Sequence, residues 1–162
     1  MRALRILVLL AVLGLGAPAA SGTTIGFGKS ILQGTSSTKP TSLQFGPDDR
    51  LYVAQSMLQR ILVMEPRPGT TPAVHCTLPR GYPDGFCFDA TGRLYVAGSL
   101  GDVLVVFAPD GTVDEVVEMG AGSEPTNCCL GDGVLYVTLA GSGQLVSLAT
   151  PVEPLALHPS RR

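Results

Sequence analysis

The chain reads Arg50-Leu51-Tyr52-Val53-Ala54, then Arg93-Leu94-Tyr95-Val96-Ala97, then Val134-Leu135-Tyr136-Val137-Thr138. These stretches mark a unit of about 42 residues that occurs three times, because Tyr52 and Tyr95 lie 43 residues apart and Tyr95 and Tyr136 lie 41 apart. Each copy has a Pro ahead of a short apolar strand, then a Gly or Asp turn, the Leu-Tyr-Val strand and a second apolar run. Periods of this size, carried by several short strands, are typical of β-propeller blades.

Strand-sized segments follow one another in all three copies. They are rich in Val, Leu, Ile, Phe and Tyr and are bounded by Gly, Pro or Asp. The predicted strands are 42–45, 51–54, 60–64 and 73–78 in the first copy, 86–89, 94–97, 103–107 and 112–118 in the second, and 128–130, 135–139 and 144–148 in the third. A fourth strand is weak or absent in the third copy. The sequence predicts an all-β fold, a partial β-propeller of about three four-stranded blades.

The first 20 residues have the pattern of a secretory signal peptide. A basic start with Arg2 and Arg5 precedes an uninterrupted apolar run from Ile6 to Leu13, and small residues at 17–20 offer a cleavage site. The run is shorter than the roughly 17 to 25 residues of a membrane span, although a retained anchor is the alternative. We expect a secreted or periplasmic protein. Its predicted parts are a signal peptide at 1–20, an N-terminal strand and linker at 21–39, and blades at about 40–81, 82–123 and 124–155 with a short tail to 162.

Charge and composition restrict the class of partner. Only 15% of the residues are charged, and the formal net charge of −2 becomes −4 once Arg2 and Arg5 leave with the signal peptide. No run of Lys or Arg could follow a phosphate backbone, so nucleic acid is not an expected partner. Every later apolar run is broken by Gly, Pro or a charge, so no membrane span is expected after signal cleavage.

The chain has four cysteines, Cys76, Cys87, Cys128 and Cys129. An even number in a secreted protein allows disulfides, whereas the other interpretation is that they are small buried hydrophobic residues. The repeat would place neighbouring strands together so that the favoured pairs are Cys76 with Cys87 or Cys87 with Cys129. The sequence leaves both the pairing and the redox state open.

The second and third copies carry a family resemblance. Residues 82–97 read YPDGFCFDATGRLYVA, residues 124–129 read EPTNCC and residues 135–138 read LYVT. This pattern, over about residues 80–150, resembles the SMP-30/gluconolactonase/luciferin-regenerating-like family. The first copy, from Lys39 to Gln55, instead resembles the opening blade of secreted propellers such as the glucose/sorbosone dehydrogenase-like group.

The resemblance implies an activity and a site. Members of the family are six-bladed, TolB-like propellers that hydrolyse sugar lactones or related esters with a divalent cation at the channel mouth. Asp84, in the loop before an innermost strand, stands where the family has an Asp metal ligand, so Asp84 is the candidate catalytic and metal-binding residue. A cation (Ca²⁺, Zn²⁺ or Mn²⁺) would polarise the lactone carbonyl, while a carboxylate would accept a proton from water. Asn127 is a weaker metal candidate, because its position in the family is chiefly structural.

The chain departs from the family pattern at other ligand positions. The family also uses a Glu near the start of the propeller and an Asn in a Ser-Asn-Gly-type loop, whereas Asn127 is the one Asn of this chain. Thr41 and Thr126 align with Asp84 in the other two copies. A calcium site takes six to eight oxygen ligands, which one carboxylate and two threonines do not supply.

Two functions therefore remain open. The first is a metal-dependent lactonase-like hydrolase that takes a lactone or sugar ligand at Asp84. The second is a non-catalytic binding or structural module built from blades of the NHL or sorbosone-dehydrogenase-like kind, in which the Pro-Asp-Gly of Asp84 is simply a turn. The mature chain holds about 3.4 repeat units, while closed propellers have roughly four to eight blades. Self-association into a closed ring, an open fold and a fragmentary product are the alternatives.

Several other residues have structural interpretations. We expect Asp89 and Asp132 to be solvated turn residues, and the three repeated tyrosines at 52, 95 and 136 to pack in the core. His75 lies in a predicted strand and His158 in the Pro-rich tail, so no Ser-His-Asp or Cys-His arrangement is indicated.

Overall fold

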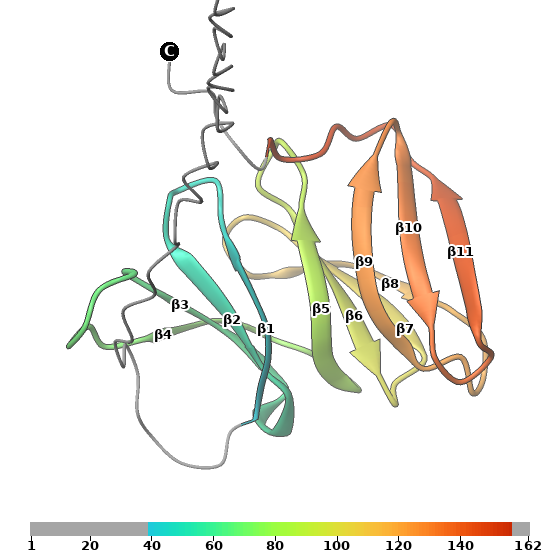
Figure 1. The fold of residues 1–162 in the computed structure, drawn as a ribbon, viewed down its shortest axis with the longest axis horizontal. Coiled ribbons are helices and arrows are strands. Elements are labelled where there is room, and N and C mark those ends of the chain that lie inside the picture. The colour runs from blue at the N-terminus through green and yellow to red at the C-terminus, as the bar shows by residue number, and fades with distance from the viewer. Residues whose placement is uncertain (1–38, 157–162) are drawn as a thin grey trace, which may run out of the picture.

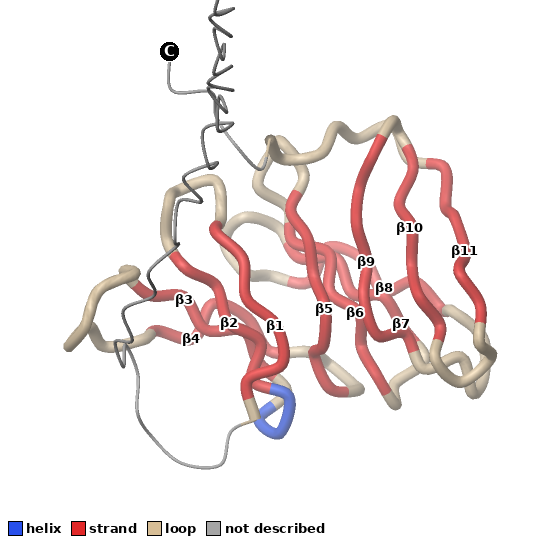
Figure 2. The backbone as a smooth tube through the Cα atoms, in the orientation of Figure 1, coloured by secondary structure: helices blue, strands red, loops and turns tan. Residues whose placement is uncertain are grey.

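The computed structural model describes residues 39–156, which form three antiparallel sheets of short strands (Figure 1). The predicted signal peptide, the linker up to residue 38 and His158 lie outside the described residues. The all-β prediction is confirmed, because the one helical segment among the described residues is the 3-10 turn Ser56–Leu58 (Figure 2). No helix in the described range is long and apolar enough to cross a membrane.

Each sheet is a meander of consecutive strands, and each corresponds to one copy of the repeat. The first contains β1 (Pro40–Phe45), β2 (Leu51–Gln55), β3 (Arg60–Met64) and β4 (Ala73–Thr77). The second contains β5 (Tyr82–Phe88), β6 (Leu94–Ser99), β7 (Val103–Phe107) and β8 (Val113–Glu118). The third contains β9 (Pro125–Gly131), β10 (Val134–Leu139) and β11 (Gln144–Ala149), and within the described residues it has no fourth strand.

The second sheet lies between the other two, and its strands β5 to β7 are largely buried on both faces (Figure 1). Successive residues of a strand point to opposite faces, so one strand serves two cores. In β5, Phe86 and Phe88 belong to the core shared with the first sheet, while Cys87 belongs to the core shared with the third. The continuous apolar run of β7 is explained in the same way, because all five of its residues are buried.

The repeated tyrosines show how the sheets succeed one another. Tyr52 faces the second sheet and Tyr95 faces the third, and both are buried, as predicted. The prediction was wrong for Tyr136, whose side chain is 39% exposed. Tyr136 occupies the same position in its sheet, on the face turned away from the second sheet, and no further sheet among the described residues covers it.

Asp89 also differs from the expectation of a solvated turn residue, because it is completely buried. The chain after β11 returns across this turn: Ala90 N–H donates to the carbonyl of Glu153 at 2.8 Å, and Leu155 N–H donates to the carbonyl of Phe88 at 3.1 Å. The local sequence predicts the turn correctly, but Asp89 is buried by a segment that lies more than 60 residues later in the chain. Asp132 is exposed in its turn, as expected.

Candidate functional site

The innermost strands β1, β5 and β9 share one irregularity near their starts. In each, the register with the following strand slips between two paired residues, which is a β-bulge. In β5 the slip falls between Pro83, paired with Gly98, and Phe86, paired with Val96, so that Asp84 and its neighbour occupy the bulge. Thr41 occupies the corresponding bulge in β1, and Thr126 occupies the one in β9. These are the two positions that align with Asp84 in the sequence.

Asp84 therefore lies inside a strand and not in the loop that the sequence suggested. A bulge bends the strand and redirects a side chain, which is why bulges are frequent beside functional sites. Asp84 lines a cleft of about 340 Å³ between the first two sheets. The residues that line this cleft are Lys39, Thr41, Ser56, Met57, Tyr82, Asp84, Ser99 and Leu100.

The cleft is built from matching positions of the first two repeats. Lys39 and Tyr82, Thr41 and Asp84, Ser56 and Ser99, and Met57 and Leu100 are four pairs, and each pair is separated by 43 residues. Sequence reasoning singled out only the second pair. The signal that would have found the rest is the repeat itself, because residues at one offset in successive blades lie at the same end of their sheets.

The polar environment of Asp84 is sparse. Among residues 39–156 its carboxylate has no hydrogen-bond or ion-pair partner, although Lys39 lines the same cleft. Partial burial without a compensating partner raises the pKa of Asp84 above its usual value. Thr41 crosses between the sheets here, since its hydroxyl donates to the carbonyl of Pro83 at 3.1 Å. Asp84 is thus a half-buried carboxyl in a cleft that the first two sheets share.

Asn127 lies in β9, again within a strand and not in a loop, and it lines a different hollow. Its Oδ1 accepts a hydrogen bond from the N–H of Cys128 at 2.9 Å, and its backbone carbonyl accepts one from the Thr138 hydroxyl at 3.3 Å. It also packs directly over Gly85. Asn127 borders a groove of about 660 Å³ along the innermost strands, whereas Asp84 lines the smaller cleft. The two candidate ligands do not line the same hollow.

The comparison with known proteins decides the family. The sequence profile of the SMP-30/Gluconolactonase/LRE-like region matches residues 23–141. The chain belongs to this family. The resemblance seen in the second and third repeats is thereby confirmed, and the match extends over the first repeat as well.

Relatives in the family include named lactonases. An L-arabinolactonase from Azospirillum brasilense is 33% identical over 108 residues, which are 63% of this chain and 36% of the relative. A gluconolactonase structure from Xanthomonas campestris is 31% identical with a TM-score of 0.58 and covers 69% of this chain and 38% of its own. The calcium-binding protein regucalcin from Agrobacterium tumefaciens, at 21% identity and a TM-score of 0.62, covers 72% and 47% and supports the propeller fold alone.

The chain spans less than half of the length of each of these relatives, from 36% to 47%. Three sheets of the family fold are therefore present among the described residues.

A divalent cation implied by the family does not fit the described residues. Asp84 is the one carboxylate among the residues that line its cleft, and Lys39 brings a positive charge to the same cleft. No group of three or more His, Cys, Asp or Glu side chains in the described range could hold a metal ion. Hard cations such as Ca²⁺ take six to eight oxygens. These residues alone do not form such a site.

The remaining candidates have structural roles. The ring of His75 packs edge-on against Tyr52, with centroids 5.0 Å apart, and burial lowers the pKa of His75. The hydroxyl of Tyr52 in turn donates to Asp48 Oδ2 at 3.1 Å. His75 is not among the residues that line the Asp84 cleft.

Proposed function

We propose that this chain is a secreted or periplasmic member of its family that binds a sugar lactone in the cleft beside Asp84. The observation that carries the proposal is the partly buried, unpartnered carboxylate of Asp84 in a cleft built from matching positions of two blades. The lactonase relatives support the class of ligand.

The chemistry of the cleft suits a polyhydroxylated ester. The Asp84 carboxylate accepts hydrogen bonds from sugar hydroxyls, while the Lys39 ammonium and the hydroxyl of Ser99 donate to ring or carbonyl oxygens. A carboxylate whose pKa is raised is also a better proton acceptor. For hydrolysis, Asp84 would take a proton from water as its oxygen adds to the lactone carbonyl. The bond between the carbonyl carbon and the ring oxygen then breaks, and Asp84 returns its proton to that leaving oxygen, which gives the open hydroxy acid.

The second candidate function is a binding module without catalysis. It is favoured by one observation, namely that a single carboxylate lines the cleft without other acidic or imidazole groups beside it. The same cleft would then hold a lactone or sugar without opening its ring. The two functions share the ligand site and differ only in turnover.

We also propose that a second copy of the chain covers the open faces of the outer sheets. Leu43 and Phe45 on the first sheet are 67% and 53% exposed, yet the residues at the matching positions of the second sheet, Phe86 and Phe88, are 4% and 2% exposed. At the other end, Leu145 is 69% exposed while its counterpart Leu104 is 1% exposed. These apolar positions are buried where a neighbouring blade covers them, and they mark an association surface where no blade among residues 39–156 does.

The experiment measures binding, turnover and mass on the purified full chain. Gluconolactone and arabinonolactone are titrated by ligand-observed NMR, and acid release is followed with and without Ca²⁺, Zn²⁺ or Mn²⁺. We expect Asp84→Asn to weaken lactone binding at least about tenfold, the loss of one charged hydrogen bond. Asp110→Asn, which changes an exposed carboxylate that also follows a Pro, is the matched control.

The outcomes separate the alternatives. Binding that is equal in wild type and Asp84→Asn would contradict the proposed site. Binding without acid release above the spontaneous rate identifies the binding module, whereas acid release that Asp84→Asn abolishes identifies the hydrolase. Native mass spectrometry of the same samples tests for the second copy, and a monomer at every concentration would contradict self-association.

A further inference from the structure

Two buried thiols from neighbouring sheets touch each other. Cys87 Sγ in β5 lies 3.8 Å from Cys128 Sγ in β9, although the residues are 41 positions apart. Both side chains are buried, at 8% and 6% exposure, within the core that the second and third sheets share. All four cysteines are free thiols in the structure.

The alternation of strand residues explains why these two cysteines meet. Cys87 points from the second sheet towards the third, and Cys128 points from the third sheet back towards the second. Cys129 occupies the position of Cys87 in the following repeat, so it points away and is exposed. Cys76 lies in the other core, between the first and second sheets. Cys76 and Cys87 therefore lie in different cores, and the structure contains neither of the two pairings that the sequence favoured.

One groove borders three of the four cysteine positions. Cys87 and Cys128 both line the groove of about 660 Å³ along the innermost strands, as does Cys129. The thiol of Cys128 also donates to the backbone carbonyl of Tyr95 at 3.3 Å. Contact with Cys87, and then burial, raise the pKa of Cys128, so its exchange with an outside disulfide will be slow at neutral pH.

We propose that Cys87 and Cys128 form a disulfide that joins the second and third blades when the protein is in an oxidising compartment. The oxidant is a small or protein disulfide. One thiolate attacks a sulfur of that disulfide and releases one thiol, and the second cysteine then displaces the other half as a second thiol. Two cysteine thiols are oxidised, the external disulfide is reduced, and the two protons pass to the released thiols. An S–S bond of about 2.0 Å needs only a side-chain movement of about 2 Å from the observed contact.

The cross-link would hold together two sheets that otherwise associate only through side-chain packing. Closing a loop of this length restricts the unfolded chain, which stabilises the folded state. We expect the oxidised protein to melt about 10 °C above the reduced protein. The proposal does not depend on the lactone site, because neither cysteine lines the cleft of Asp84.

The test uses the full chain, purified reduced and then incubated in glutathione disulfide near pH 8.5. After alkylation of free thiols and digestion with trypsin, mass spectrometry should find peptide 81–93, which holds Cys87, linked to peptide 94–161. Because the second peptide holds both Cys128 and Cys129, fragmentation of the linked species and single variants assign the bond. The link and the melting shift should persist in Cys129→Ser and vanish in Cys128→Ser.

Three results would overturn the proposal. They are a linked peptide that persists in Cys128→Ser, a link assigned by fragmentation to Cys129, and complete alkylation of Cys87 in wild type after prolonged oxidation. Cys87→Ser serves as a second variant should Cys128→Ser fold poorly, and it must also lose the melting shift. Cys76→Ser, altered in the other core, must keep the link.

Discussion

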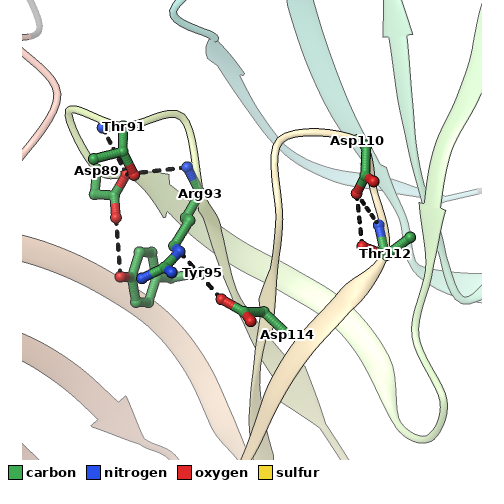
Figure 3. Close-up of polar contacts among 7 residues, drawn as sticks. All are labelled: Asp89, Thr91, Arg93, Tyr95, Asp110, Thr112 and Asp114. Atoms are coloured by element: carbon green, nitrogen blue, oxygen red, sulfur yellow. Dashed lines mark hydrogen bonds and ion pairs between the residues drawn. The ribbon is translucent and has the colours of Figure 1, made fainter.

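The hydroxyl of Tyr95 donates a hydrogen bond to Asp89 Oδ2 at 3.1 Å in the interior of the protein (Figure 3). The other carboxylate oxygen of Asp89 accepts from the N–H and the hydroxyl of Thr91, at 2.9 and 2.7 Å, and from the N–H of Arg93 at 3.0 Å. Four donors thus surround one completely buried carboxylate. The Asp89 side chain thus links the turn between β5 and β6 to β6 through hydrogen bonds.

We expect Asp89→Asn to lower the free energy of unfolding by about 1–3 kcal/mol, because an amide replaces an acceptor oxygen with a donor next to buried donors. Urea denaturation at neutral pH measures the loss. Asp48→Asn is the matched control, since Asp48 has the same relation to Tyr52 but lies in an exposed turn. Equal losses in the two variants would show that burial of Asp89 is not the cause.

Gly85 of the second sheet lies directly against Asn127 of the third sheet. A Cβ at this position would overlap the side-chain amide of Asn127 and lie 2.7 Å from its Cα. Gly85→Ala should therefore destabilise the protein by about 1–3 kcal/mol through overpacking. Gly131→Ala, in the same strand as Asn127, meets no atom within 4 Å and should change stability little. Thermal melting of both variants tests this difference.

Alkaline pH should weaken the fold. Burial raises the pKa of Cys76 from 9.0 to about 12 and that of Tyr95 from 10.0 to about 12. A raised pKa in the folded state means that the stabilisation is complete below the unfolded pKa and is lost as the pH rises through the folded one. The free energy of unfolding should fall between pH 9 and pH 12. Denaturant titrations along this range should give a shallower slope for Cys76→Ala and Tyr95→Phe, but not for Cys129→Ser at the surface.

Asp84 should cost the protein stability at neutral pH. Burial raises its pKa above 3.8, so the neutral form is favoured in the folded state and that advantage is lost once the carboxyl ionises. Asp84→Asn should therefore be more stable than wild type at pH 7, and the difference should shrink as the pH falls towards 4. Denaturation of both proteins at the two pH values measures the effect. A variant less stable than wild type at pH 7 would assign Asp84 a purely structural role.

The exposed aromatic of β1 should control assembly. Phe45→Glu places a charge on the open face of the first sheet, where Phe45 is 53% exposed, and should shift any dimer to monomer with little loss of monomer stability. Light scattering during size-exclusion chromatography gives the masses. Val113→Glu is the control, because Val113 is 47% exposed but lies in β8 of the middle sheet. A dimer unaffected by Phe45→Glu would place the contact elsewhere.

The repeat predicted the strands well because each blade is a local meander whose turns are marked by Gly, Pro and Asp. It predicted the burial of Tyr52 and Tyr95 for the same reason. It failed for Tyr136, since burial there depends on a sheet beyond the described third one, and for Asp89, whose cover comes from residues 153–155. Non-local cover is not encoded in the turn sequence.

The candidate site was found only in part for a related reason. Asp84 stands out through its family motif, but a bulge is a property of the pairing between two strands and does not appear in either strand alone. Lys39 and Ser99 belong to no distinctive motif. Each matches another cleft residue in the neighbouring repeat, Lys39 with Tyr82 and Ser99 with Ser56, so a comparison of the repeats would have identified them. The contact between Cys87 and Cys128 could be predicted only by knowing which way side chains point in both sheets.

The bulge that recurs in β1, β5 and β9 holds residues that differ between the repeats and that lie outside the packed cores. Its side chains, Thr41, Asp84 and Thr126, lie at one end of the strands, outside the alternation that fills the two cores. Substitution at these positions can therefore change the chemistry of that end while the packing between blades stays intact. A protein of this construction can gain or lose a ligand group through single mutations, one blade at a time.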